Sequence, residues 1–204
     1  MIKTVVFDLG GVYFKRGTNL MLPKLFNLLG SPPDKIKEVF SSYRRGEGWL
    51  FRKGIISAQE FWRRVRKKLD LSEKETEQIK EFWYACYEPN KGMPELVEEL
   101  REQDYYVIVF SGNIQERMEF LDQRYGIYNK FDDFVLSFDF GLSKRDEAFY
   151  LILLQNIRCQ PQECVCVDDS LRVIKKEQKF GLKTILFKDS DQTRRELRKL
   201  GVSI

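Results

Sequence analysis

The sequence predicts an α/β protein with a doubly wound parallel sheet and a helical insertion. Three short apolar runs carry this prediction, at residues 4–7, 107–110 and 164–167. Runs rich in β-branched and aromatic residues are typical of strands that are buried on both faces of a parallel sheet. After residue 92, helical and strand patterns alternate, which is typical of βαβ units.

The first strand is followed by a long segment with helical patterns only. After a glycine-rich turn, residues 18–88 contain leucines at helical spacing, a proline-rich helix start at Ser31–Asp34, and capping boxes that begin at Ser57 and Ser72. We expect four helices and no strand here, with glycine-bearing loops around residues 46–48 and at residue 54.

The remaining elements follow from the alternation after residue 92. In chain order we expect a helix to 103, a strand to 110, a helix over 114–125, a strand over 134–137, a helix over 145–156, a strand over 164–167, a helix over 171–180, a strand over 183–187 and a final helix. The helical segment therefore interrupts the core between its first two strands. We predict a core of residues 1–17 and 89–204 and a helical domain of residues 18–88.

Composition narrows the classes of function. The 204 residues include 35 Lys plus Arg and 31 Asp plus Glu, a milder excess of positive charge than a dedicated nucleic-acid binder carries. The four cysteines form no Cys-x-x-Cys pair, so we expect free thiols. No signal peptide pattern is present and no run approaches the ~20 apolar residues that cross a bilayer, so we expect a soluble, cytoplasmic protein with no membrane contact. The sequence does not specify an oligomeric state.

The chain contains no histidine. Histidine-based triads, phosphocarriers and metal sites are therefore excluded, and chemistry must use carboxylates, lysine, hydroxyls, thiols or a bound hard cation. Clustered carboxylates favour magnesium, which binds oxygen ligands.

Polar residues follow directly on the three apolar runs. Asp8 ends the first, Ser111 ends the second, and the pair Asp168-Asp169 ends the third. Since ligands bind beyond the carboxyl ends of parallel strands, these side chains are expected in one crevice. The alternative is coincidence, because Asp and Ser commonly terminate strands.

Four segments, in order, resemble the motifs of the haloacid dehalogenase-like (HAD) hydrolase superfamily. They are Phe7–Val12, Phe110–Asn113, Gly141–Lys144 and Asp168–Ser170. The resemblance covers the whole chain and implies a Rossmann-like core whose helical cap is inserted after the first strand. It also implies a magnesium-dependent phosphatase-like hydrolase that acts on a small phosphorylated molecule.

The resemblance implies a role for each motif residue. Asp8 would be the nucleophile that forms an aspartyl-phosphate. Phosphate oxygens would be held by Lys144 and by the segment Ser111, Gly112 and Asn113, which precedes a helix. Mg²⁺ would be bound by Asp8, the backbone carbonyl of Gly10 and Asp169, with Asp168 acting through water or by orienting Lys144.

Gly10 departs from the family pattern. Most phosphatases of the family carry a second aspartate at this position, which serves as general acid and base. A backbone carbonyl can still bind the metal, so the change removes proton transfer, which is typically worth ~10²- to 10⁴-fold in rate. We therefore expect a preference for substrates with good leaving groups.

Two other functions remain open from the sequence. A metal-independent 2-haloacid dehalogenase uses the same aspartate, although the Asp168-Asp169 pair has little purpose without a metal. A catalytically impaired binding module could use the basic run 63–68 with Arg44, Arg45, Arg52 and Lys53 to bind an acidic partner. A solvated helix face explains that run more simply. Nucleic acid is therefore not an expected partner.

Trp49 and Phe51 are candidates for substrate specificity. Aromatic residues of the helical segment are expected in its core. These two lie in a predicted glycine-flanked loop that could face the crevice.

Overall fold

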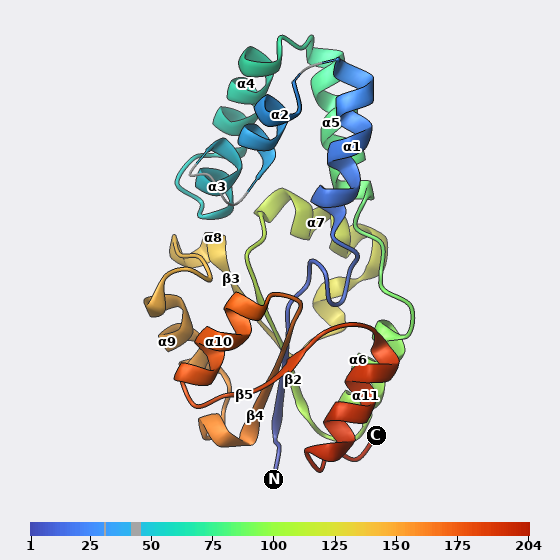
Figure 1. The fold of residues 1–204 in the computed structure, drawn as a ribbon, viewed down its shortest axis with the longest axis vertical. Helices are drawn as coiled ribbons and strands as arrows, with labels where there is room; N and C mark the ends of the chain where they lie inside the picture. The colour runs from blue at the N-terminus through green and yellow to red at the C-terminus, as the bar shows by residue number, and fades with distance from the viewer. Residues whose placement is uncertain (31, 42–45) are drawn as a thin grey trace.

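The computed structural model describes residues 1–30, 32–41 and 46–204. It contains a five-stranded sheet in which all neighbouring strands are parallel, in the order β3-β2-β1-β4-β5 (Figure 1). The strands are β1 (Thr4–Phe7), β2 (Tyr106–Ser111), β3 (Asp133–Leu136), β4 (Cys164–Asp168) and β5 (Lys183–Leu186). The predicted fold class is confirmed.

Helices cover both faces of the sheet. Successive side chains of each strand point to opposite faces, so each face presents apolar side chains that a helix layer buries. Val5 and Phe7 of β1 face the side covered by α6 (Met93–Glu102), α7 (Gln115–Tyr125) and α11 (Ser190–Lys199). Val6 faces the side covered by α9 (Glu147–Asn156), while α10 (Leu171–Lys179) contacts β4 and β5. Short turns of helix lie at α8 (Ser137–Phe140), η1 (Ile127–Asn129) and η2 (Pro161–Glu163).

The strand order reverses beside β1. The chain continues from β1 to β2 and β3 on one side and returns to β4 and β5 on the other. A crevice at the carboxyl ends of β1 and β4 is therefore the expected ligand position.

Within its described residues, the segment after β1 contains five helices, which we call the cap and which form a separate body at the carboxyl end of the sheet (Figure 1). They are α1 (Gly17–Leu29), α2 (Pro33–Phe40), α3 (Glu47–Arg52), α4 (Ala58–Leu69) and α5 (Glu73–Ala85). The prediction of four helices was wrong, because α3 occupies part of the expected glycine-bearing loop. A helix of six residues is too short to show a helical repeat in sequence.

The cap has its own hydrophobic core, in which Phe40, Phe61, Trp62 and Trp83 contact one another. Aromatic pairs of this kind add to the free energy gained by burial. The aromatic content of the segment is thus largely structural, as the sequence predicts.

The predicted helix starts are partly reproduced. Ser72 and Glu75 form a reciprocal capping box at the start of α5, and Ser57 accepts a bond from the Glu60 amide at the start of α4. At α2 the capping position is Pro32. Ser31 lies outside the described residues.

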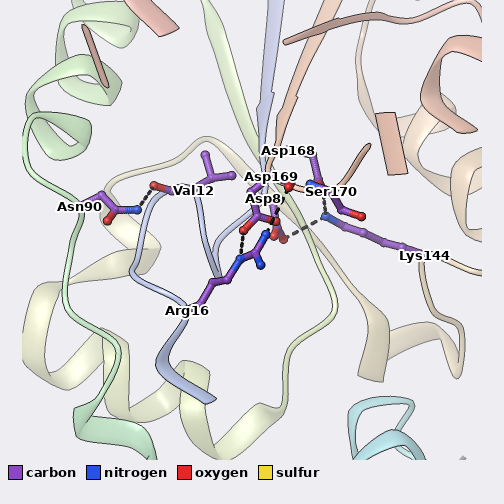
Figure 2. Close-up of polar contacts among 8 residues, drawn as sticks. All are labelled: Asp8, Val12, Arg16, Asn90, Lys144, Asp168, Asp169 and Ser170. Atoms are coloured by element: carbon purple, nitrogen blue, oxygen red, sulfur yellow. Dashed lines mark hydrogen bonds and ion pairs between the residues drawn. The ribbon is translucent and has the colours of Figure 1, made fainter. Parts of the chain in front are cut away.

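The two connections between cap and core run side by side. Phe14 and Pro89 form an antiparallel bridge, and the Asn90 amide donates to the Tyr13 carbonyl at 2.8 Å. The Asn90 side chain also donates to the Val12 carbonyl at 2.7 Å (Figure 2). The domain limits of 1–17, 18–88 and 89–204 stay a prediction, with the first limit falling inside α1.

No helix among the described residues is long and apolar enough to cross a membrane.

Candidate active site

A cavity of about 480 Å³ lies at the carboxyl ends of the strands, between core and cap. Asp8 directly follows β1 and Asp168 ends β4, and these strands are paired so that Phe7 lies beside Val167. Ser111 ends β2 on the other side of β1. The three strand ends therefore bring their polar side chains to one cavity, as predicted.

Lys144 joins two of these carboxylates. Its ammonium group lies 2.9 Å from Asp8 Oδ1 and 2.7 Å from Asp168 Oδ2 (Figure 2). Lys144 reaches them from the loop between α8 and α9, and its carbonyl accepts a bond from the Tyr150 hydroxyl at 2.9 Å. Burial opposes its charge, but Asp168 and Asp8 outweigh that effect and raise the pKa of Lys144.

Asp8 is held in a less polar setting than a surface carboxylate. Burial raises the pKa of Asp8 to about 6, with Lys144 opposing the shift and the charges of Asp168 and Asp169 adding to it. At neutral pH the group is mostly ionised, so it can act as a nucleophile or a ligand.

Asp168 is the most buried of the three aspartates, with 2% of its surface exposed. Its second oxygen accepts a bond from the Ser170 amide at 2.8 Å. Both of its oxygens are thus engaged, which suits a side chain that orients Lys144.

Asp169 carries the third carboxylate, which the Arg16 guanidinium contacts through an ion pair (Figure 2). Gly11 lies directly beside it, with a φ of 111°, and a Cβ at that position would overlap the Asp169 carboxylate. Glycine is therefore required here by space as well as by backbone conformation.

The aspartates fit a hard divalent cation. One carboxylate oxygen from each of Asp8, Asp168 and Asp169 can be chosen so that all lie within 4.8 Å of one another. Magnesium prefers such oxygen ligands, and the space left by Gly11 admits the Asp169 carboxylate to this cluster. Gly10 also lines the cavity, where its carbonyl could complete the ligand set.

Ser111 ends β2, Gly112 and Asn113 follow it in the loop before α7, and all three line the cavity. Asn113 is buried, and its side-chain oxygen accepts bonds from the Ile114 amide and from Arg117, both at 3.0 Å. Asn113 thereby fixes the loop at the start of α7, where backbone amides can receive an anion.

A protein-family model for haloacid dehalogenase-like hydrolases matches residues 2–175. The chain belongs to this family. Among solved structures, a HAD family enzyme of Bacteroides thetaiotaomicron crystallised with magnesium and inorganic phosphate shares the fold, with a TM-score of 0.75 and 22% identity. The match covers 92% of this chain and 95% of that one.

Two relatives of this HAD-like hydrolase are named for reactions on phosphate esters. Sesquiterpene phosphatase astK of Aspergillus oryzae is 25% identical, over 97% of this chain and 96% of its own length. The chloroplast flavin mononucleotide hydrolase 1 of Arabidopsis thaliana is 26% identical over 76% of this chain, which spans 63% of that protein. With the family, these relatives support a hydrolase of the phosphatase kind.

In this hydrolase the space beside Gly10 is taken by Tyr87. A Cβ at residue 10 would lie 3.4 Å from the Tyr87 ring, an ordinary contact distance. The Tyr87 hydroxyl lies 3.0 Å from Thr18 Oγ1. A side chain at residue 10 would therefore begin in contact with the Tyr87 ring.

The two aromatic candidates for specificity separate. Trp49, on α3, lines the cavity and is partly exposed. Phe51 is 5% exposed and stacks on Phe61 at a ring distance of 4.5 Å inside the cap. The prediction for Phe51 was wrong, because the helical turn of α3 directs residues 49 and 51 to different sides.

Several lining residues were not among the sequence candidates for the site, and four of them bear on its chemistry. They are Arg16, Arg52, Lys53 and Tyr87. Arg52 and Lys53 were noted in sequence only as part of a basic region. No local pattern marks these four. Arg16 lies beside Asp169 from the segment before α1, while Arg52, Lys53 and Tyr87 reach the cavity through the placement of the cap on the core.

Proposed function

We propose that this protein is a magnesium-dependent phosphatase that hydrolyses a small phosphomonoester through an aspartyl-phosphate on Asp8. The observation that carries the proposal is the cluster of Asp8, Asp168 and Asp169 with Lys144 at one end of a cavity. The three acids are paired with Lys144 and Arg16, so the cluster keeps an excess of one negative charge, which a divalent cation would offset. The family and the names of two relatives, a sesquiterpene phosphatase and a flavin mononucleotide hydrolase, support the same chemistry.

Each residue has a definite part in the proposed reaction. An oxygen of Asp8 bonds to phosphorus while the bond from phosphorus to the leaving oxygen breaks, and that oxygen takes a proton from water. A second water then attacks the acyl phosphate, which releases phosphate and restores the carboxylate. Lys144 and the Ser111–Asn113 loop hold the phosphate oxygens during both steps.

Mg²⁺ would be held by Asp8, Asp169 and the Gly10 carbonyl, with Asp168 contributing indirectly. Bound there, it would offset the charge of the phosphate as Asp8 approaches. Arg16 pairs with Oδ2 of Asp169, so Mg²⁺ would bind the other oxygen of this carboxylate or displace the guanidinium.

Gly10 sets the choice of leaving group. Since no acid stands at residue 10 to protonate the leaving oxygen, aryl, acyl or anomeric sugar phosphates should react faster than simple alkyl phosphates. Steady-state kinetics on a series of phosphates of graded leaving-group acidity tests this, and equal kcat/KM across the series would contradict it.

The proposed function is tested by phosphate release from p-nitrophenyl phosphate with and without Mg²⁺. We expect turnover that requires the metal and is lost in Asp8→Asn, which removes the nucleophile and controls for a contaminating phosphatase. Chloride release from a 2-haloacid without metal would instead support the dehalogenase alternative.

The binding-module alternative rests on the basic run 63–68. Arg63 and Arg64 both pair with Glu60 on the exposed side of α4, at 2.7 and 2.6 Å, which fits a solvated helix face. Arg44 and Arg45 lie outside the described residues. Salt-dependent retention on nucleic acid that is lost in the double variant Arg63→Glu, Arg64→Glu would support this alternative.

A further inference from the structure

The cavity carries more positive charge than the transfer of one phosphoryl group requires. Apart from Asp8, Asp168 and Asp169, every charged side chain among its described lining residues is a cation. Besides Lys144 these are Arg16, Arg52, Lys53, Arg145 and Arg172. Arg52 and Lys53 come from the cap and stand apart from the aspartate cluster in the sequence and in the fold.

Arg52 is buried at the cavity wall, with 9% of its surface exposed. Its guanidinium donates to the carbonyls of Phe40 at 3.0 Å and Gly48 at 2.8 Å, and to Thr18 Oγ1 at 3.4 Å. These acceptors are all uncharged. No carboxylate of the described residues forms an ion pair with Arg52.

A second buried arginine lies near it. Arg117, on α7, is 1% exposed, and its guanidinium lies between the rings of Trp83 and Tyr87, 4.3 Å from each. Its Nε and one Nη have no acceptor among the described residues. Burial, followed by repulsion from Arg117, lowers the pKa of Arg52 to about 10, so Arg52 stays charged at neutral pH, and burial also lowers the pKa of Arg117.

Two buried cations without a carboxylate partner are costly for the fold. The aromatic rings around Arg117 recover part of that cost through cation–π contacts. An anion bound in the cavity would supply the counter-charge that Arg52 lacks.

Lys53 stands beside Arg52 at the end of α3. It is 12% exposed, its ammonium lies 4.8 Å from the centre of the Trp49 ring, and it pairs with Asp146 at 3.3 Å. Asp146 also accepts bonds from the amide and hydroxyl of Ser143, at 2.9 and 2.8 Å. Lys53 therefore shares its only described carboxylate with other donors and keeps capacity for a ligand anion.

We propose that the substrate of this enzyme carries a second anionic group, a carboxylate or a second phosphate, which Arg52 and Lys53 bind while the first phosphate lies at Asp8. This inference rests on the proposed phosphatase function. It separates the chain from a phosphatase for hydrocarbon alcohols, because six of the described lining side chains are cations.

Two matched substrate pairs test the inference. The rigid pair is 4-carboxyphenyl phosphate and its neutral 4-carbamoylphenyl analogue, and the flexible pair is 3-phosphoglycerate and glycerol 3-phosphate. We expect at least about a tenfold higher kcat/KM for the acid in one or both pairs, mainly through KM. High salt should reduce this preference, since screening weakens charge recognition.

Variants assign the effect to the cap. Lys53→Gln should lower the preference for the acid severalfold while leaving turnover of p-nitrophenyl phosphate measurable. Arg52→Lys keeps the charge but loses the paired donors, so it should weaken the preference without removing it. Lys74→Gln, which removes an exposed cap charge on α5, is the matched control and should leave the preference unchanged.

The outcomes separate the two proposals. Equal kcat/KM within both pairs, together with metal-dependent turnover of p-nitrophenyl phosphate, would overturn the second anion site and leave the phosphatase function intact. A preference for the acid that persists in both Lys53→Gln and Arg52→Lys would also overturn it. Failure to turn over any of the five phosphates would overturn the phosphatase function, and this inference with it.

Discussion

Glu177 offers a direct test of the electrostatics behind the active site. This residue lies on α10, is 2% exposed, and one of its carboxyl oxygens has no donor among the described residues. Burial, with a further contribution from Asp168, raises the pKa of Glu177 to about 8 from an ordinary value of 4.5. The carboxyl should therefore be largely neutral at pH 7, and Glu177→Gln replaces it with a neutral group of the same shape.

The raised pKa makes the folded protein lose stability as pH rises. Between the unfolded pKa of 4.5 and the folded pKa of about 8, the folded state retains a proton that the unfolded state has released. The free energy of unfolding then falls by about 1.4 kcal/mol per pH unit, where the folded state holds one full proton more than the unfolded state. Glutamine does not titrate. Between pH 5 and pH 9, the free energy of unfolding of Glu177→Gln should therefore rise by on the order of 4 kcal/mol relative to that of the wild type.

The assay is urea unfolding of both proteins at pH 5, 7 and 9, followed by circular dichroism. Glu102→Gln, at an exposed position of α6, makes the same chemical change outside the buried site and is the matched control. Parallel stability curves for wild type and Glu177→Gln would refute the reasoning, since they would mean that Glu177 ionises as readily in the folded protein as in the unfolded chain.

Three further predictions concern catalysis. Gly10→Asp should raise kcat/KM for alkyl phosphates by about 10²-fold but much less for p-nitrophenyl phosphate, and equal gains on both would contradict the leaving-group argument. Lys144→Met should lower phosphate release by about 10²- to 10³-fold, because Asp8 and Asp168 then face the substrate uncompensated; a folded variant, checked by circular dichroism, with near-normal rates would exclude this role. Because the pKa of Asp8 is raised to about 6, its protonation should weaken Mg²⁺ binding about tenfold per unit below that pH, as measured by calorimetry, and a flat profile would speak against Asp8 as ligand.

Much of the fold was predictable because buried parallel strands leave a strong signal. The strands β1, β2 and β4 are nearly continuous apolar runs, and each ends at the polar residue that the structure brings to the cavity. Strand ends are fixed by local sequence, and parallel pairing carries them to one edge of the sheet. The positions of Asp8, Ser111 and Asp168 therefore follow from sequence with few assumptions.

The cap side of the cavity was not predictable in the same way. The helix α3 begins after Gly46 without a side-chain cap and is too short to show periodicity, so neither its existence nor the inward direction of Phe51 could be derived. Arg52 and Tyr87 reach the cavity only because the cap is placed against the core. Such contacts depend on tertiary packing, which a single sequence does not specify.

The paired connections between cap and core have a consequence for how such a protein can be altered. Phe14 and Pro89 are paired in space although they lie 75 positions apart in sequence, so the chain leaves the core for the cap and returns to it at one place. The entropic cost of closing a loop rises only slowly with the number of residues in the loop. The cap could therefore be replaced by a different helical segment joined at the same bridge. Such a replacement could change which molecules reach Asp8 while the sheet and its aspartates stay unchanged.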